Sequence, residues 1–379
     1  MQQRIYLDHA ATTPLHPQVI HLMHETMLSN YVNPSSIHAE GRTSRALIEK
    51  ARKTMANHFN CSIGEIFFTS GATESNNMII QGAVSGLGVQ TIITAATEHH
   101  AVLHTIEVLE KEGKIKVIYL PLDKEGNPSI LSLEEHLAKE ENKKVLVSLM
   151  HSNNETGTLL YWENVGAICQ KYDALFHSDT VQSVGFYDID LQNIPVHFIA
   201  GSAHKFNGPK GIGFAYIRNE NAIPPFQHGG SQERNMRGGT ENLLGIVGMA
   251  LALDLAMSEK SERFAHLEKL KLQLFNGLKN VIPGIKINGP GLENSHPKIL
   301  NIGFPPNPKA TMLLFNLDIE GISTSGGSAC SSGTDTGSHV LRAIYPENQH
   351  ISVRFSFSHL NTSAEVDKVI EIISNIYRN

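Results

Sequence analysis

The segment GSAHKFNGPKGIG (residues 201–213) contains a lysine, Lys205, that follows a short apolar run and is surrounded by glycine and proline. A lysine amine is a nucleophile only when it is unprotonated, and partial burial at the end of a strand lowers its pKa. Lys205 is therefore a candidate for a Schiff base with a carbonyl compound, although a solvated lysine in a glycine-rich turn fits the same pattern. Ser202 and His204 add a hydroxyl and an imidazole at the same strand end, and both suit a phosphate group.

A second segment, FTSGATESNN (residues 68–77), is typical of a strand, a tight turn and the start of a helix. Backbone N–H groups at a helix start, together with the hydroxyl of Thr73, form an anion site of the kind that holds a phosphate monoester. An ordinary capped helix would show the same pattern. A phosphate site and a Schiff-base lysine in one chain together indicate the cofactor pyridoxal phosphate.

Two further polar side chains follow apolar runs and match what this cofactor requires. Pyridoxal phosphate needs an acid that faces its pyridinium nitrogen, and Asp179 follows the run ALFHS, where it could also cap the next helix. His99, in TIITAATEHHAV, could stack on the cofactor ring or carry protons. The neighbouring His100 and His104 also suggest a metal, but no HExxH spacing or nearby cysteine pair supports one, so we expect no metal site.

The elements that must carry these side chains alternate between short apolar runs and helical patterns from about residue 60 to residue 220. This alternation predicts an α/β fold with a mostly parallel sheet between helices. Ligands bind outside the carboxyl ends of strands in open α/β sheets, so we expect the site at the polar ends of these runs. The strand candidates are EIFFTSG, TIITAATEHHAV, KVIYLPLD, KVLVSLMHSNNETG, ALFHSDTVQ, HFIAGSAHK and GFAYIR.

The pattern changes after residue 240, where long helical segments precede a smaller α+β part with the strand candidates KILNIGF and ISVRFSFS. The chain ends in a helix whose start, Thr362-x-x-Glu365, fits a capping box. Between the two strands lies GISTSGGSACSSGTDTGSH, which is flexible by composition. We expect a large cofactor-binding domain at residues 15–256, and a small domain at residues 1–14 and 257–379 that carries this mobile loop at about 323–338.

Composition and charge limit the classes of function. The chain has 379 residues, a formal net charge of -6 and no long basic run, which gives no electrostatic reason to expect direct binding to nucleic acid or a membrane. The N-terminus lacks the pattern of a signal peptide and no apolar run approaches the roughly 20 residues of a membrane span, so we expect a cytoplasmic protein. The three cysteines, Cys61, Cys169 and Cys330, are too scattered for a disulfide framework.

Eight motifs, in this order and at these separations, closely resemble the cysteine desulfurases of the NifS/IscS type, within the class V aminotransferases of the fold-type I pyridoxal phosphate enzymes. The motifs are YLDHAATTP, SGATESNN, TEHHAVLH, NNETG, HSDTVQSVG, SAHKFNGPKGIG, RGGTEN and SGGSACSSG. The resemblance covers about residue 4 to residue 375. It implies a large domain with a mostly parallel seven-stranded sheet between helices, a smaller α+β domain, and a homodimer, because the family's active site is composite.

The resemblance assigns roles to individual residues. Lys205 matches the Schiff-base lysine, Asp179 the partner of the pyridinium nitrogen, and His99 the residue that stacks on the ring and handles protons. Cys330 matches the cysteine that carries sulfur. The remaining matches are Gln182 at the phenolic oxygen of the cofactor; the Ala72 N–H, Thr73, Ser202 and His204 at its phosphate; Thr240 at that phosphate from the second subunit; and Asn154 at the cofactor and, with Arg354 and Asn33, around the substrate.

The matched residues predict the conversion of L-cysteine to L-alanine, with sulfur held as a persulfide on Cys330 and passed to an acceptor protein. Glycines on both sides of Cys330 suit the travel that such a carrier needs, whereas we expect Cys61 and Cys169 to be structural. Iron–sulfur scaffolds and the thiouridylases that modify tRNA both accept such sulfur, and the sequence does not choose between them. A selenocysteine lyase or another β-eliminating enzyme is the alternative, and a non-catalytic assembly scaffold is a more distant one.

Overall fold

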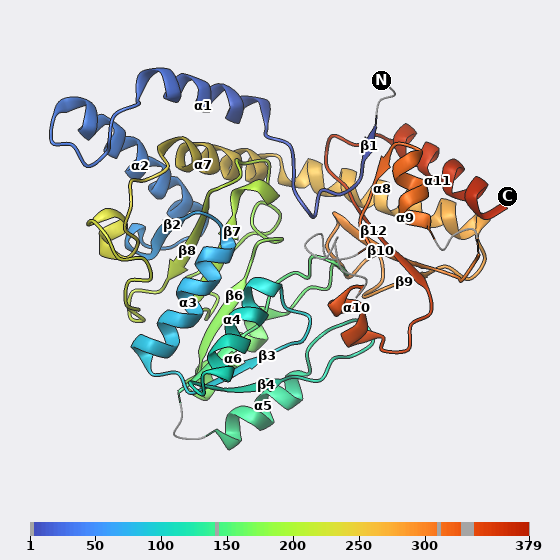
Figure 1. Cartoon of the computed structure of the whole chain (residues 1–379), viewed down its shortest axis with the longest axis horizontal. Coiled ribbons are helices and arrows are strands. Elements are labelled where there is room, and N and C mark those ends of the chain that lie inside the picture. The colour runs from blue at the N-terminus through green and yellow to red at the C-terminus, as the bar shows by residue number, and fades with distance from the viewer. Residues whose placement is uncertain (1–3, 141–143, 309–311, 327–336, 379) are drawn as a thin grey trace.

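The computed structural model describes residues 4–140, 144–308, 312–326 and 337–378 (Figure 1). Within these ranges the chain forms a seven-stranded sheet between helices and a smaller unit around a three-stranded sheet. The predicted α/β fold is confirmed.

The large sheet has the strand order β2-β8-β7-β6-β5-β3-β4. Strand β8 runs antiparallel to both of its neighbours, and the other neighbouring pairs are parallel. The strands coincide with the seven apolar runs of the sequence: β2 (Ile66–Thr69), β3 (Thr91–Thr94), β4 (Lys116–Tyr119), β5 (Val145–Ser148), β6 (Leu175–Asp179), β7 (Phe198–Ser202) and β8 (Gly213–Ile217).

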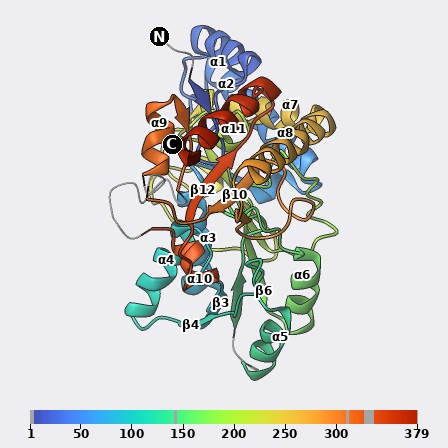
Figure 2. The same ribbon diagram turned by 90° about the vertical axis from the view of Figure 1, so that its right-hand side faces the viewer.

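Both faces of this sheet are buried, because successive residues of its central strands enter different hydrophobic clusters. Ile92 of β3 packs on the side of α3 (Ala72–Leu87) and α4 (His100–Lys111), whereas Ile93 packs on the other side. Figure 2 shows α4 and α6 on opposite sides of the strands. The helices that contribute to the second cluster are α1 (Pro17–Ser29), α2 (Ala39–His58), α5 (Ile130–Lys139), α6 (Trp162–Lys171) and α7 (Leu243–Ser258).

The smaller unit is built on the antiparallel strands β9 (Lys286–Ile287), β10 (Ile299–Phe304) and β12 (Ile351–Ser356), and on the parallel pair β1 (Ile5–Tyr6) and β11 (Ile322–Ser323). Its helices are α8 (Lys260–Val281), α9 (Leu313–Ile319), α10 (His339–Ile344) and α11 (Ser363–Arg378). Ile5 and Leu7 share one hydrophobic cluster with residues of α8, β10 and α11. The N-terminal residues therefore pack on the C-terminal part of the chain, while the exact boundaries at 14/15 and 256/257 stay a prediction.

Two local predictions for the C-terminal half can be compared with the structure. The capping box is confirmed, since Thr362 N donates to Glu365 Oε2 at 2.8 Å and Glu365 N donates to Thr362 Oγ1 at 3.2 Å. Strand β11 and helix α10 flank the predicted cysteine loop, and Cys330 itself lies outside the described residues. In the ranges that the structure describes, no helix has the length and apolarity needed to cross a membrane.

Candidate active site

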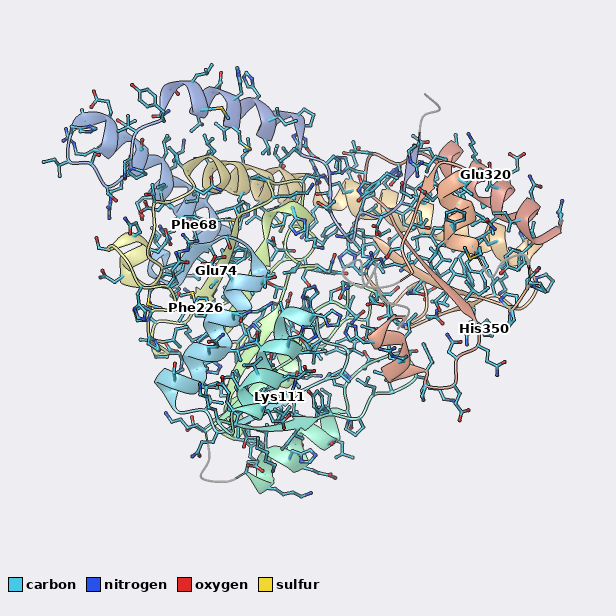
Figure 3. All side chains as sticks on the ribbon, in the orientation of Figure 1. Phe68, Glu74, Lys111, Phe226, Glu320 and His350 are labelled. Atoms are coloured by element: carbon cyan, nitrogen blue, oxygen red, sulfur yellow. The ribbon has the colours of Figure 1, made fainter. Side chains whose placement is uncertain are left out.

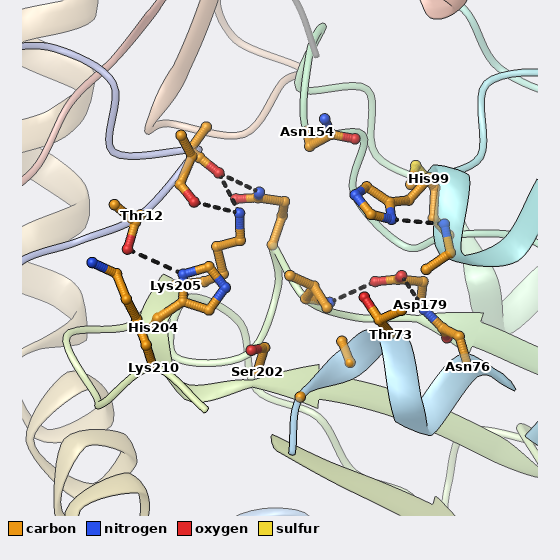
Figure 4. Close-up of a pocket in the computed structure, with 18 of the residues that line it drawn as sticks. Thr12, Thr73, Asn76, His99, Asn154, Asp179, Ser202, His204, Lys205 and Lys210 are labelled. Atoms are coloured by element: carbon orange, nitrogen blue, oxygen red, sulfur yellow. Dashed lines mark hydrogen bonds between the residues drawn. The ribbon is translucent and has the colours of Figure 1, made fainter. Parts of the chain in front are cut away.

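A cavity of about 500 Å³ lies at the carboxyl ends of β6 and β7 (Figure 4). The structure thus brings together side chains that the sequence places at separate strand ends, as the rule for open α/β sheets predicts. Ten of the predicted site residues line this cavity: Ala72, Thr73, His99, Asn154, Asp179, Gln182, Ser202, His204, Lys205 and Arg354.

Lys205 is held beside the N-terminal segment of the chain. It ends a short 3-10 helix, η2 (Ala203–Lys205), that directly follows β7. Its Nζ donates hydrogen bonds to the backbone carbonyls of Ala10 at 2.7 Å and Ala11 at 2.8 Å, and Gln182 Nε2 donates to the same Ala10 carbonyl at 3.0 Å. The lysine amine is therefore fixed in position by neutral acceptors at the wall of the cavity.

Asp179 is the last residue of β6 and is almost fully buried. Its Oδ1 accepts from the Val181 N–H at 3.0 Å, which is the turn-capping contact that the sequence left open as an alternative. Its Oδ2 accepts from Asn76 Nδ2 at 2.7 Å. The cap does not exclude the predicted role, because the carboxylate also lines the cavity and is fixed there by two donors.

His99 is the N-cap of α4, where its Nδ1 accepts from the Ala101 N–H at 3.1 Å. This bond assigns the remaining ring proton to Nε2. Burial lowers the pKa of His99, and nearby Lys205 lowers it further, while Asp179 acts in the opposite direction. The imidazole is therefore neutral near pH 7 and suited to taking up a proton.

The predicted phosphate site is the start of α3. The N-cap of this helix is Gly71, which caps it without a side-chain hydrogen bond, so the first backbone N–H groups, next to Thr73, are available to an anion. A Cβ atom on Gly213 of β8 would lie 2.7 Å from the Gly71 Cα, so the strand and the turn meet at a distance that only glycine allows. Ser202, at the end of β7, lies beside this turn and lines the same cavity.

His204 completes this end of the cavity. Its Nδ1 lies 3.1 Å from Thr12 Oγ1. Burial, together with the charges of Lys205 and Lys210, lowers the pKa of His204 to about 4. Lys210 and a neutral histidine next to a helix start provide donors of the kind that a phosphate group needs.

Arg354, on β12, reaches the cavity from the smaller unit with a side chain that is 1% exposed. Its Nη1 donates to the Asn154 carbonyl at 2.9 Å, and its Nη2 donates to Asp8 Oδ1 at 2.7 Å. Its Nε is buried without a partner among the described residues. A guanidinium with a donor to spare suits a ligand carboxylate.

These groups fit pyridoxal phosphate. Besides the uncapped start of α3, the buried Oε1 of Gln182 lacks a partner in the described part of the chain, although the same side chain lines the cavity. Unsatisfied buried polar atoms are costly unless a ligand pairs with them. Asp179 and Lys205 add the acid and the amine that this cofactor requires.

Two predicted residues, Asn33 and Thr240, do not enter this cavity in a single chain. Asn33 is exposed between α1 and α2, where its Oδ1 accepts from the Ser35 N–H at 2.9 Å. Thr240 lines a smaller neighbouring cavity of about 150 Å³ that shares Ser70 with the main one. Cys330 lies outside the described residues. The roles assigned to these three residues stay predictions, as do the roles of the ten that line the cavity.

Sequence reasoning missed other residues of the cavity, chiefly Asn76, Lys210 and the Ala10 and Ala11 carbonyls. Asn76 carried a usable signal, since it follows Thr73 by three positions and so lies on the same face of α3. The two carbonyls carried none, because backbone groups of a distant segment have no signature of their own.

Cys61 and Cys169 have the character expected of structural cysteines. Burial raises the pKa of the Cys61 thiol to about 12 and raises that of Cys169 further. Both thiols therefore stay protonated and are poor nucleophiles near pH 7.

Comparison with known proteins places this chain among pyridoxal phosphate enzymes. The family model "Aminotransferase class-V" matches residues 5–369. "Cysteine desulfurase IscS" of Dictyoglomus turgidum is 40% identical over 99% of this chain and 95% of its own length. A solved structure named "NIFS-LIKE PROTEIN" has a TM-score of 0.90 and 38% identity over 99% of both chains. Another, "SspA in complex with cysteine", has a TM-score of 0.80 and 30% identity over 94% of this chain and all of its own.

The chain belongs to the class V aminotransferase family. It is accordingly a pyridoxal-phosphate-dependent enzyme, and relatives about 40% identical over nearly its whole length are named cysteine desulfurases.

Proposed function

We propose that this chain converts L-cysteine to L-alanine in the Lys205 cavity and delivers the sulfur through Cys330. The chain is a pyridoxal-phosphate-dependent cysteine desulfurase by family and relatives. The observation that supports the site most directly is the convergence of Lys205, Asp179, His99 and Arg354 on one cavity from four separate elements.

The cofactor would be held at both of its ends. Asp179 and Gln182 would bind the ring, and the start of α3, Ser202 and His204 would bind the phosphate. When bound, pyridoxal phosphate supplies a ring that accepts electrons from the α-carbon of an attached amino acid. The chain itself must orient the substrate and move its protons.

Arg354 would bind the substrate carboxylate, since its Nε has no partner in the described part of the chain and its guanidinium is fixed by Asp8 and the Asn154 carbonyl. Lys205 Nζ, fixed by the Ala10 and Ala11 carbonyls, would take the proton from the α-carbon. His99 is neutral and carries its ring proton on Nε2, so it would exchange protons with the substrate.

The sulfur step needs a thiolate, and Cys330 is the candidate because the thiols of Cys61 and Cys169 have raised pKa values. The Cys330 sulfur attacks the sulfur of bound L-cysteine, so an S–S bond forms and the substrate C–S bond breaks. The electron pair stays with the β-carbon, which takes up a proton to become the methyl group of L-alanine. Two thiols become one persulfide while that carbon is reduced, so no external oxidant is needed.

We also propose that the enzyme works as a homodimer. Large apolar side chains are exposed on α1 and on the segment that joins it to α2, including Met27, Tyr31 at 85% and Ile37 at 90% exposure. Phe226 is also exposed, and it lies on the large unit, away from Glu320 of the smaller unit (Figure 3). A second copy that covered this surface would bury it and bring Asn33 and Thr240 near the Lys205 cavity of that copy.

The persulfide would pass to an acceptor protein with a reactive thiol, either an iron–sulfur scaffold or a tRNA thiouridylase. The cytoplasmic location expected from the sequence stays a prediction.

The test compares Cys330→Ser with the matched control Cys61→Ser on L-cysteine and on L-selenocysteine. We expect Cys330→Ser to lose alanine production from L-cysteine while Cys61→Ser keeps it. Equal loss in both variants, or no loss in Cys330→Ser, contradicts the assigned role of Cys330. Turnover of selenocysteine alone, with Cys330→Ser as active as the wild type, favours the selenocysteine lyase instead.

A further inference from the structure

We propose that Ser148, His177 and Asn76 form a directional hydrogen-bond chain that positions the Asp179 carboxylate against the ring nitrogen of the cofactor. The proposal rests on the proposed function, because it assumes that Asp179 faces that nitrogen. All three are positioning residues, since they act through Asp179 and not on the substrate.

The topology of the sheet brings the four side chains together. Ser148 ends β5, and His177 and Asp179 stand two positions apart on the neighbouring strand β6, so both point to the face covered by α3. Asn76 comes from α3 and lies between them. Ser148 Oγ is 2.9 Å from His177 Nδ1, His177 Nε2 is 3.1 Å from Asn76 Oδ1, and Asn76 Nδ2 is 2.7 Å from Asp179 Oδ2.

The hydrogen-bond chain has only one consistent set of donors and acceptors. A carboxylate accepts, so Asn76 must turn its Nδ2 group toward Asp179 and its Oδ1 toward His177. Oδ1 also accepts, so His177 carries its proton on Nε2, and its Nδ1 accepts from the Ser148 hydroxyl. Each bond therefore fixes the direction of the next, and the last one fixes the carboxylate.

Burial keeps this arrangement stable. Ser148, His177 and Asn76 are each 0% exposed and Asp179 is 5% exposed, so water does not compete for these bonds. Burial also lowers the pKa of His177 to about 3, which keeps the ring neutral and in one tautomer throughout the working pH range. A second proton on the ring would remove the acceptor for Ser148 and place a positive charge beside the amide. The neutral imidazole thus orients Asp179 without competing for its charge.

The test compares His177→Phe, which keeps a ring but removes both bonds, with His177→Gln, which keeps a donor near the Nε2 position. The control is His197→Phe. The His197 Nδ1 accepts from the N–H of Phe176, which lies on the same strand as His177, but His197 is not part of the hydrogen-bond chain. The measurement is the dissociation constant of the full-length protein for pyridoxal phosphate and for its 1-deaza analogue, which lacks the ring nitrogen, by absorbance titration.

We expect His177→Phe to bind pyridoxal phosphate about tenfold more weakly than the wild type, and His177→Gln to recover most of this loss. The deaza analogue should bind the wild type and both variants equally, because it offers Asp179 nothing to pair with. Equal weakening for both compounds overturns the proposal, as does unchanged affinity for pyridoxal phosphate. Should His177→Phe not fold, Ser148→Ala gives the same comparison with a smaller change.

Failure of the proposed function would look different. A wild-type protein that binds neither compound, or binds both equally, lacks the contact between Asp179 and the ring nitrogen, and this outcome contradicts the cofactor placement before any variant is compared.

Discussion

Replacing Arg354 by lysine tests how the substrate carboxylate is held. The guanidinium donates through Nη1 to the Asn154 carbonyl and through Nη2 to Asp8, and its buried Nε has no partner among the described residues, so N–H groups remain for a ligand. A lysine has one nitrogen and cannot serve Asp8, the carbonyl and a carboxylate in the same geometry. The expected loss is one charge-assisted hydrogen bond, about 1.5–3 kcal/mol, which corresponds to about 10- to 150-fold in kcat/KM.

The assay is steady-state alanine formation from L-cysteine with the cofactor-loaded variant. The carboxylate is bound equally in the ground state and the transition state, so the loss should appear mainly as a raised KM. Arg218→Lys is the matched control, because Arg218 is a partly buried arginine that donates to the carbonyls of Val196, Leu191 and Ile194 far from any substrate. An unchanged kcat/KM in Arg354→Lys would refute the assignment, and so would an equal loss in the control.

Three further outcomes follow from the structure. Glu233→Gln should lower the free energy of unfolding in urea by about 3–5 kcal/mol, because it breaks a buried pair with Arg52 at 2.7 Å; a change below 1 kcal/mol would count against this. The acid limb of the pH profile of kcat/KM should lie below pH 6.5, where His99 takes up a proton, and should be absent in His99→Gln. His9 and His177 have pKa values lowered to about 3 by burial, so the unfolded state binds more protons between about pH 3 and 6.5. The unfolding free energy should therefore fall as pH drops below 6.5, by up to about 1.4 kcal/mol per pH unit for each histidine, and a flat profile between pH 6.5 and 5 would contradict it.

The sequence predicted most of the sheet because buried parallel strands leave a strong local signal. Apolar runs such as TIIT and VLVS are β3 and β5, and the polar groups after them mark the carboxyl edge. Lys205 and Asp179 could be placed at the site because each ends or directly follows such a strand.

What escaped prediction depends on contacts between distant segments. The Ala10 and Ala11 carbonyls reach Lys205 only because the N-terminal strand packs on the C-terminal part of the chain. The link from His177 through Asn76 to Asp179 joins α3 to β6 across 101 and 103 positions, respectively. The break at Glu259 between α7 and α8 has no proline or glycine to mark it, so the sequence does not show where the first helix ends.

The central claim is that sulfur from L-cysteine comes to rest on Cys330. The most direct measurement incubates the cofactor-loaded protein with L-cysteine in the absence of a reductant, quantifies alanine, and locates added sulfur by mass spectrometry of its peptides. We expect one alanine per active site and one added sulfur on the peptide that contains Cys330, with none on those of Cys61 or Cys169. Alanine without sulfur on Cys330, or sulfur on another cysteine, would contradict the claim.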